Sequence, residues 1–212
     1  MHPSRRSVLL GLSLSGPLSG LAAPALAGRG PEPERIPGEL VEDTLALPSA
    51  VRLGHPHGDV IMVEFFDYNC PWCKRSAGEL EALLKAEPDL TYVLMNYPIL
   101  DPASVEAARV ALGYLQMQGP ADYLKLHLGL FGLRGPVNGA RALGVAKGLG
   151  LDEKGLTDRA AGEPTTRVLN EALRLGNSLG LVATPSFVLT PLAYIGGMNL
   201  DQKRAAIAEA RG

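Results

Sequence analysis

The chain has 212 residues, of which 46% are hydrophobic and 20% charged, and its formal net charge is −2 at pH 7. A chain of this size and composition is long enough for one globular domain with a well-developed core. It carries no basic stripe with interleaved aromatic residues, so a charge-driven nucleic-acid-binding protein is excluded and no nucleic-acid partner is expected.

The first 27 residues have the pattern of an export signal. Arg5-Arg6 supplies a positive start, Val8–Leu21 is apolar, and the small residues that end at Ala27 fit a peptidase cleavage site. The arginine pair also fits a twin-arginine signal, which exports folded proteins in bacteria. We predict cleavage near Ala27, a periplasmic location and no stable membrane insertion afterwards. A general secretory signal and an uncleaved anchor are the alternatives.

The stretch before the first confident strand is short of structure-forming residues. Residues 28–43 predict a flexible lead-in, because prolines and charges dominate much of it. A short edge strand is expected within residues 45–53, followed by a turn at residues 55–58.

The next segment predicts a strand, a helix and a second strand. Val60–Asp67 is a near-continuous run of β-branched and aromatic residues, typical of a buried central strand. Pro71 fits the first turn of a helix that continues to about residue 86. Leu90–Tyr97 predicts the second strand, and Pro98 ends it.

Residues 102–180 change character, because Ala, Leu and Gly dominate and strand formers are few. Gly or Pro near the joints divides this stretch into several helices. The predicted helices cover residues 102–118, 120–131, 138–149, 152–161 and 165–179.

Strand character returns near the C-terminal end. Ser186–Thr190 and Ala193–Ile195 predict a hairpin around Pro191-Leu192. A last helix is expected to begin at Asn199 or Asp201 and to run to about residue 210.

The chain contains two cysteines, Cys70 and Cys73, at the junction of the predicted central strand and its helix. A disulfide that closes so small a loop constrains little of the unfolded chain and does little as a staple. At a helix start, orphan amide groups and the positive end of the dipole favour a thiolate, the form that attacks disulfides. The pair therefore predicts a redox-active site.

The order β-α-β, helical block, β-β-α resembles a thioredoxin-like α/β fold with an inserted all-helical subdomain, the DsbA-like family of periplasmic thiol–disulfide oxidoreductases. The motifs that carry this resemblance are Glu64–Lys74, Ala183–Phe187 and Gly196–Asp201. It implies a first half over residues 44–100, a helical insertion over 101–181 and a second half over 182–212.

The resemblance also assigns roles to individual residues. Cys70 is the exposed nucleophile, and Cys73 is the resolving thiol one turn deeper. Pro185 matches the family's cis-proline, where the backbone at Thr184 pairs with an extended substrate segment. A trans-proline that opens an edge strand is the alternative.

The residues between the cysteines, Pro71 and Trp72, set the redox potential and border the substrate. Neither is cationic, whereas strongly oxidising relatives gain a donor from a His in the second of these positions. Trp72 offers an apolar face beside the sulfur. We therefore predict a potential less oxidising than that of the strongest family members, with Lys74 and Arg75 contributing only through screened charge.

Glu64 lies six residues before Cys70 in an otherwise apolar strand, on the same face as Met62 and Phe66. A buried, unpaired carboxylate takes a raised pKa and can exchange a proton with Cys73. The family has an acid at this place. The alternative is a strand-end Glu that reaches solvent. Strand Leu90–Tyr97 offers no Lys to pair with Glu64.

These observations predict a protein thiol–disulfide oxidoreductase, with the oxidase direction favoured and an isomerase or reductase as alternatives. No metal and no cofactor other than the Cys70–Cys73 disulfide are expected. Its partners are reduced or misoxidised exported proteins and a membrane redox protein; no oligomeric state is predicted. The 32 residues between Ala27 and Val60 are too few for the dimerisation domain of the DsbC and DsbG isomerases, although Thr184 resembles those enzymes.

Three further interpretations compete with redox chemistry. Structural zinc needs four ligands, and only His55 and His57 lie near enough in sequence to complete a set. Haem attachment needs a His directly after the second cysteine, where this chain has Lys74. A periplasmic chaperone or peptide-binding module would use the groove around Trp72 and Pro185 without turnover. His127 is expected to be a surface or packing residue.

Overall fold

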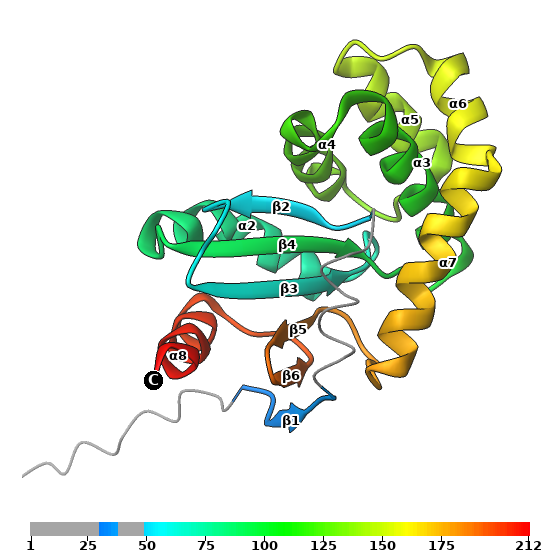
Figure 1. Cartoon of the computed structure of the whole chain (residues 1–212). Coiled ribbons are helices and arrows are strands. Elements are labelled where there is room, and N and C mark those ends of the chain that lie inside the picture. The colour runs from blue at the N-terminus through cyan, green and yellow to red at the C-terminus, as the bar shows by residue number, and fades with distance from the viewer. Residues whose placement is uncertain (1–29, 38–48) are drawn as a thin grey trace, which may run out of the picture.

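The computed structural model describes residues 30–37 and 49–212. Its sheet has the strand order β1-β6-β5-β3-β4-β2, and β3 and β4 are its parallel pair (Figure 1). The strands are β1 (Pro33–Arg35), β2 (Val51–Gly54), β3 (Val60–Phe66), β4 (Leu90–Asn96), β5 (Ser186–Leu189) and β6 (Leu192–Ile195). The helices are α2 (Pro71–Ala86), α3 (Pro102–Gln118), α4 (Pro120–Gly132), α5 (Gly139–Gly148), α6 (Glu153–Ala161), α7 (Glu163–Ser178) and α8 (Leu200–Arg211).

Strand β3 lies in the middle of the sheet, parallel to β4 on one side and antiparallel to β5 on the other. Helix α2 makes the crossover between β3 and β4, as parallel strands require. This β-α-β unit places the start of α2 at the carboxyl end of β3, and so it places both cysteines at one edge of the sheet.

The two faces of the sheet bury separate sets of side chains, because strand residues alternate between faces. On one face Met62 and Phe66 of β3 pack in the same apolar cluster as residues of α2 and α8. On the other face Val63 and Phe65 pack against apolar residues of α7. Glu64 belongs to the face that α2 and α8 cover.

The helical insertion occupies the stretch between β4 and β5 and forms a separate layer at one end of the sheet (Figure 1). Helix α3 is its centre, in contact with α4, α5, α6 and α7. The predicted helices differ from the observed ones by at most two residues at either end. Helix α7 leads the chain from this layer back to the sheet.

The prediction of a flexible lead-in is wrong for its described part. Pro33–Arg35 forms β1, an edge strand that pairs antiparallel with β6, and Ile36 is buried in the cluster on the α7 face. Pro33 is compatible with this place because an edge strand tolerates a residue that cannot donate to the ladder. Of the short strand expected at Leu45–Leu53, residues 45–48 lie outside the described residues, and the described strand β2 runs from Val51 to Gly54.

The predicted export signal lies outside the described residues. Within the part of the chain that the structure describes, no helix combines the length and the apolar character needed to cross a membrane.

Close packing between α7 and the sheet gives a first prediction. A Cβ added to Gly176 would lie 2.3 Å from Cε2 of Tyr97. The Tyr97 ring cannot move aside freely, because its hydroxyl donates to Asn177 Oδ1 and to the Leu181 carbonyl, both at 2.8 Å. We expect Gly176→Ala to lower the free energy of unfolding by about 1–3 kcal/mol in urea titration.

Gly144→Ala is the matched control, because a Cβ at this helical position meets no heavy atom within 4 Å. It should leave the free energy of unfolding unchanged or raise it by about 0.5–1 kcal/mol. Equal effects of the two substitutions would contradict the packing argument.

Candidate active site

Cys70 is the N-cap residue of α2. The sequence predicted it within the first helical turn, which begins one position later, at Pro71. Pro71 follows at the first helical position, where its missing N–H costs no hydrogen bond. The Cys73 backbone N–H donates to Cys70 Sγ over 3.4 Å, so the sulfur accepts the bond that a capping oxygen usually accepts. The helix start therefore holds the sulfur in the position that favours its anion.

The cis-proline turn covers the same sulfur from the other side. The Thr184–Pro185 peptide bond is cis, in agreement with the family resemblance, and the Cys70 thiol donates to the Thr184 carbonyl over 3.1 Å. Cys70 is only 4% exposed, so the prediction of an exposed cysteine is wrong for this unbound form.

The pKa of Cys70 is lowered to about 6. A hydrogen bond from the Cys73 thiol is the largest cause, burial opposes it, and the Thr184 side chain and the backbone amides of Cys73 and Trp72 lower it further. The buried Thr184 hydroxyl has no hydrogen-bond partner in the described part of the chain while Cys70 carries its proton. When Cys70 ionises, its sulfur becomes an acceptor, and the Thr184 hydroxyl can donate a hydrogen bond to it. Cys70 is therefore largely a thiolate at neutral pH.

Cys73 behaves in the opposite way. It is 1% exposed, and burial raises its pKa far above the usual range, with further contributions from the Cys70 sulfur and the Glu64 charge. Its sulfur accepts a long hydrogen bond of 3.5 Å from the Asp67 backbone N–H. The two sulfurs, three residues apart, thus differ strongly in how easily they lose a proton.

The turn that leads into Cys70 is fixed by two polar residues that sequence reasoning did not single out. Asp67 is buried and accepts hydrogen bonds from the Asn69 amide at 2.8 Å and the Ser104 hydroxyl at 2.7 Å. Asn69 exchanges two bonds with the Val137 backbone, at 2.6 and 3.0 Å. Ser104 and Val137 both belong to the helical insertion, so the insertion holds the turn before Cys70 in place.

Trp72 projects from the first turn of α2 and is 59% exposed. Its ring lies against Gly197, where an added Cβ would come within 3.3 Å of ring atom Cε3. The neighbouring Gly196 amide donates to the Pro185 carbonyl at 3.0 Å. Trp72 therefore forms an apolar rim beside the cis-proline turn, as its predicted role in substrate contact requires.

A cavity of about 360 Å³ opens on the side of Cys70 that faces the helical insertion. Its lining includes Tyr68, Cys70, Pro71, Leu130, Phe131 and Val137. Cys70 is thus flanked by the cis-proline turn on one side and by this cavity on the other.

Glu64 is buried at 2% exposure, so the alternative of a strand-end Glu that reaches solvent is wrong. Its Oε2 accepts a hydrogen bond of 2.5 Å from the Tyr92 hydroxyl, and its Oε1 has no hydrogen-bond partner among the described residues. Burial raises the pKa of Glu64, while the charge of Lys203 and hydrogen bonds from Tyr92 and Ser76 lower it. The carboxyl group lies close enough to influence the Cys73 thiol electrostatically.

Strand Leu90–Tyr97 offers no lysine to pair with Glu64, but a cation from another element, Lys203, acts on this carboxyl group. Lys203 comes from α8 and is fully buried. One signal for it exists in the sequence, because Lys203 shares a helical face with Leu200, Ala206 and Ile207, where an apolar residue is expected.

The other residues considered from the sequence, Lys74, Arg75 and His127, make contacts within the fold. Lys74 Nζ donates to the Leu133 carbonyl at 2.8 Å, and Arg75 pairs with Glu79 at 3.1 Å. His127 is buried against Phe66 and Phe131, and burial lowers its pKa to about 3, so it is a packing residue.

The zinc interpretation fails on geometry. The His55 amide donates to the Leu90 carbonyl at the start of β4, and β3 runs parallel to β4 away from that point. Cys70 follows the far end of β3, about 20 Å away for a strand of this length. His55 and His57 therefore cannot join the cysteines around one ion.

Comparisons with known proteins agree with this geometry. The family model described as "DSBA-like thioredoxin domain" matches residues 61–208. A thioredoxin-like oxidoreductase from Silicibacter pomeroyi DSS-3 is 35% identical, with a TM-score of 0.74 over 80% of this chain and 96% of that one. A periplasmic thioredoxin-like protein from Salmonella enterica serovar Typhimurium is 25% identical, with a TM-score of 0.69 over 84% and 99% of the two chains.

Among curated proteins, the chain is similar to part of the Na(+)/H(+) antiporter NhaA 1 of Mycobacterium sp. (strain KMS). The two are 36% identical over 63 residues, which is 28% of this chain and 10% of the antiporter. The chain therefore spans only a small part of that relative.

The asymmetry of the two sulfurs gives a second prediction. In the reduced protein, Cys70 should be a thiol below pH 6 and a thiolate above it, because its pKa is about 6. The ultraviolet absorbance of the thiolate should therefore rise with a midpoint near that pH. Cys73→Ala, which removes the largest stabilising hydrogen bond, should move the midpoint upward, and Cys73→Ser, which keeps an O–H donor, should move it less. A midpoint near 8.5, the usual value for cysteine, would contradict this assignment.

Proposed function

We propose that this chain, which belongs to the family of DSBA-like thioredoxin domains, is an exported protein thiol–disulfide oxidoreductase that works mainly as an oxidase. The observation that carries the proposal is the difference between its two sulfurs. Cys70 is poised to ionise at about pH 6, whereas burial keeps the proton on Cys73. A pair used only as a structural crosslink has no need of this difference.

The oxidase reaction starts from the Cys70–Cys73 disulfide. A substrate thiolate attacks Cys70 Sγ, the Cys70–Cys73 bond breaks, and Cys73 leaves as a thiolate that takes up a proton. A second substrate thiolate then attacks the substrate sulfur of the mixed disulfide, and Cys70 leaves as a thiolate. The substrate loses two electrons and gains a disulfide, and the enzyme is left as the dithiol. Release of the oxidised substrate in the second step is favoured because the Cys70 thiolate is a stable leaving group.

Glu64 is the proton donor and acceptor for Cys73 in this proposal. The Cys73 thiolate is costly in its buried position, so its departure is favoured when a neighbouring acid supplies a proton at once. A Glu with a pKa raised by burial can hold that proton near neutral pH. In the reverse direction the Glu64 carboxylate takes the proton before Cys73 attacks a mixed disulfide.

Substrate binding is proposed at the rim formed by Pro71, Trp72 and the Thr184–Pro185 turn. An extended segment of the client would pair with the backbone at Thr184, while Trp72 provides apolar contact. The exposure of Trp72 and the close approach of the Thr184 carbonyl to Cys70 support this placement.

The periplasm is the proposed compartment, because the N-terminal 27 residues have the pattern of an export signal and a similar protein is described as periplasmic. An oxidising compartment allows a lone cysteine pair to remain oxidised. The proposed partners are reduced or misoxidised exported proteins, and a membrane redox protein that reoxidises the pair. The sulfur pair carries the electrons, so the reaction needs no metal or organic cofactor.

An isomerase or reductase direction is the second candidate, and Thr184 before the cis-proline favours it by resemblance. A chaperone that binds peptides without turnover is the alternative of a different class. These candidates differ in whether the cysteines are needed, and in whether the pair is oxidised or reduced at steady state in the cell.

A third prediction tests the function directly. The oxidised protein should restore activity to a reduced, unfolded ribonuclease, and Cys70→Ser should abolish this effect, because no mixed disulfide can form at the missing sulfur. Incubated with a disulfide-bonded (scrambled) ribonuclease, Cys73→Ala should instead accumulate a mixed disulfide, because its Cys70 thiolate attacks a substrate disulfide and no Cys73 thiol can then release the substrate. This species should be visible as a band on a non-reducing gel that a reductant removes. Retention of activity in Cys70→Ser would point to a chaperone and overturn the proposal.

A fourth prediction concerns the redox potential. A Cys70 pKa of about 6 lies between values of roughly 3.5 for strongly oxidising DsbA and 7 for thioredoxin. Because a stable thiolate favours the reduced form, the midpoint against glutathione should fall between about −120 and −270 mV. Trp72→His should raise the midpoint by adding a donor near the sulfur. A wild-type value near −120 mV would contradict the prediction.

A further inference from the structure

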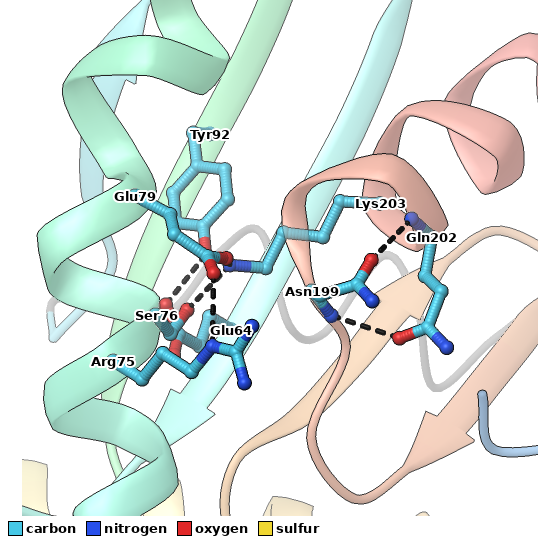
Figure 2. A network of polar contacts seen from close by, with 8 residues as sticks. All are labelled: Glu64, Arg75, Ser76, Glu79, Tyr92, Asn199, Gln202 and Lys203. Carbon is cyan, nitrogen blue, oxygen red and sulfur yellow. Dashed lines mark hydrogen bonds and ion pairs between the residues drawn. The ribbon is translucent and has the colours of Figure 1, made fainter. Parts of the chain in front are cut away.

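A buried polar network on the α2 and α8 side of the sheet includes Lys203, Ser76 and Glu79, which the steps above do not use. Lys203 extends from α8 toward Ser76 and Glu79 on α2, with Glu64 and Tyr92 beside them (Figure 2). Lys203 Nζ donates to Ser76 Oγ at 2.8 Å and pairs with Glu79 Oε2 at 3.4 Å. The same ammonium group lies 5.3 Å from the centre of the Phe187 ring.

Burial of this lysine needs a reason, because a fully buried ammonium group is costly unless it is paired. Its side chain is 0% exposed, while its partner Glu79 is 20% exposed and also binds Arg75. Glu79 is thus shared between two cations, and Lys203 retains charge that is not neutralised by Glu79 alone. Glu64 is a second acid on which the Lys203 charge acts.

The backbone places Lys203 accurately. Asn199 and Gln202 form a capping box at the start of α8, with bonds of 2.8 and 2.9 Å, so the helix begins one turn before Lys203. On α2, the residues Cys73, Ser76 and Glu79 follow one another at three-residue spacing and share one face. The network therefore connects α2, which carries Cys73, with Glu64 of β3 and with α8.

We propose that Lys203 is a positioning residue for thiol–disulfide exchange: its buried ammonium, held by Ser76 and Glu79, faces Glu64 and enables that carboxyl group to exchange protons with Cys73 at neutral pH. The inference rests on the proposed function. Without the lysine, burial alone would keep Glu64 protonated, and it could donate a proton but not accept one.

The groups that face Glu64 define how the network titrates. They are Tyr92 from β4, Cys73, Ser76 and Glu79 from α2, Lys203 from α8, and Phe187 from β5. The Lys203 charge lowers the pKa of Glu64, and the Glu79 charge raises it. Removing one or the other should therefore move Glu64 in opposite directions.

The test uses the step in which Cys73 resolves a mixed disulfide. Reduced protein is mixed rapidly with excess dithiobis(nitrobenzoate). The Cys70 thiolate attacks the reagent and releases the first thionitrobenzoate. Cys73 then gives its proton to Glu64, attacks Cys70 Sγ and releases the second. The pH midpoint of the second phase reports the ionisation of Glu64.

Lys203→Met should raise that midpoint by at least one pH unit and slow the second phase at neutral pH about tenfold. Lys203→Arg, which keeps the charge, should restore a midpoint near the wild-type value. Glu79→Gln, which is expected to fold even if Lys203→Met does not, should lower the midpoint. The ¹³C shift of the Glu64 carboxyl group should titrate in parallel.

Arg204→Met is the matched control, because it removes a cation of α8 that pairs with Glu87 at 3.0 Å instead of facing Glu64. It should leave the midpoint unchanged. In a Glu64→Gln background, Lys203→Met should cause no additional change in the pH profile.

Two outcomes would overturn the inference: unshifted midpoints in both Lys203→Met and Glu79→Gln, or a Lys203 effect that persists in the Glu64→Gln background. Failure of thiol–disulfide exchange itself is a different result, because wild-type protein would then lack the second phase altogether.

Discussion

Burial of the Cys73 thiol beside Glu64 is the constraint on which the rest of the structure depends. A thiol in this position cannot ionise at low cost, and so the pair cannot behave as two equivalent cysteines. The cause is architectural, because α2 starts after a short turn at the carboxyl end of the central strand, and its third residue, Cys73, points toward the face that α8 covers. The start of α2 has two effects. It places Cys70 at the cap position, next to backbone amide groups, and it buries the Cys73 thiol away from solvent.

The helical insertion contributes to this arrangement and is more than a cover for the sheet. The turn before Cys70 is connected to the insertion by hydrogen bonds: Asp67 accepts one from the hydroxyl of Ser104 in α3, and the Asn69 amide donates one to the Val137 carbonyl. The insertion also forms one wall of the cavity beside the nucleophile. The reactive sulfur is therefore held between two parts of the chain that are far apart in sequence, the insertion and the cis-proline turn.

Much of this could be predicted from the sequence, because the decisive signals are local. The apolar run of β3, Pro71 at a helix start and the cysteine spacing lie within a short segment, and period and capping residues determine its structure. The edge strand β1 was missed because its pairing with β6 is a long-range contact, and a segment rich in proline carries no strand signal of its own. Lys203 was missed for the same reason, since its partners on α2 lie more than 120 residues earlier in the chain.

The dependence of the redox midpoint on pH tests the central claim most directly. If Cys70 ionises at about pH 6 while Cys73 keeps its proton, reduction takes up two protons below that pH and one above it. The midpoint should then fall by about 60 mV per pH unit below pH 6 and by about 30 mV per unit from there to about pH 9. A slope that stays near 60 mV per unit up to about pH 8.5 would show that both sulfurs behave as ordinary thiols, and it would contradict this account.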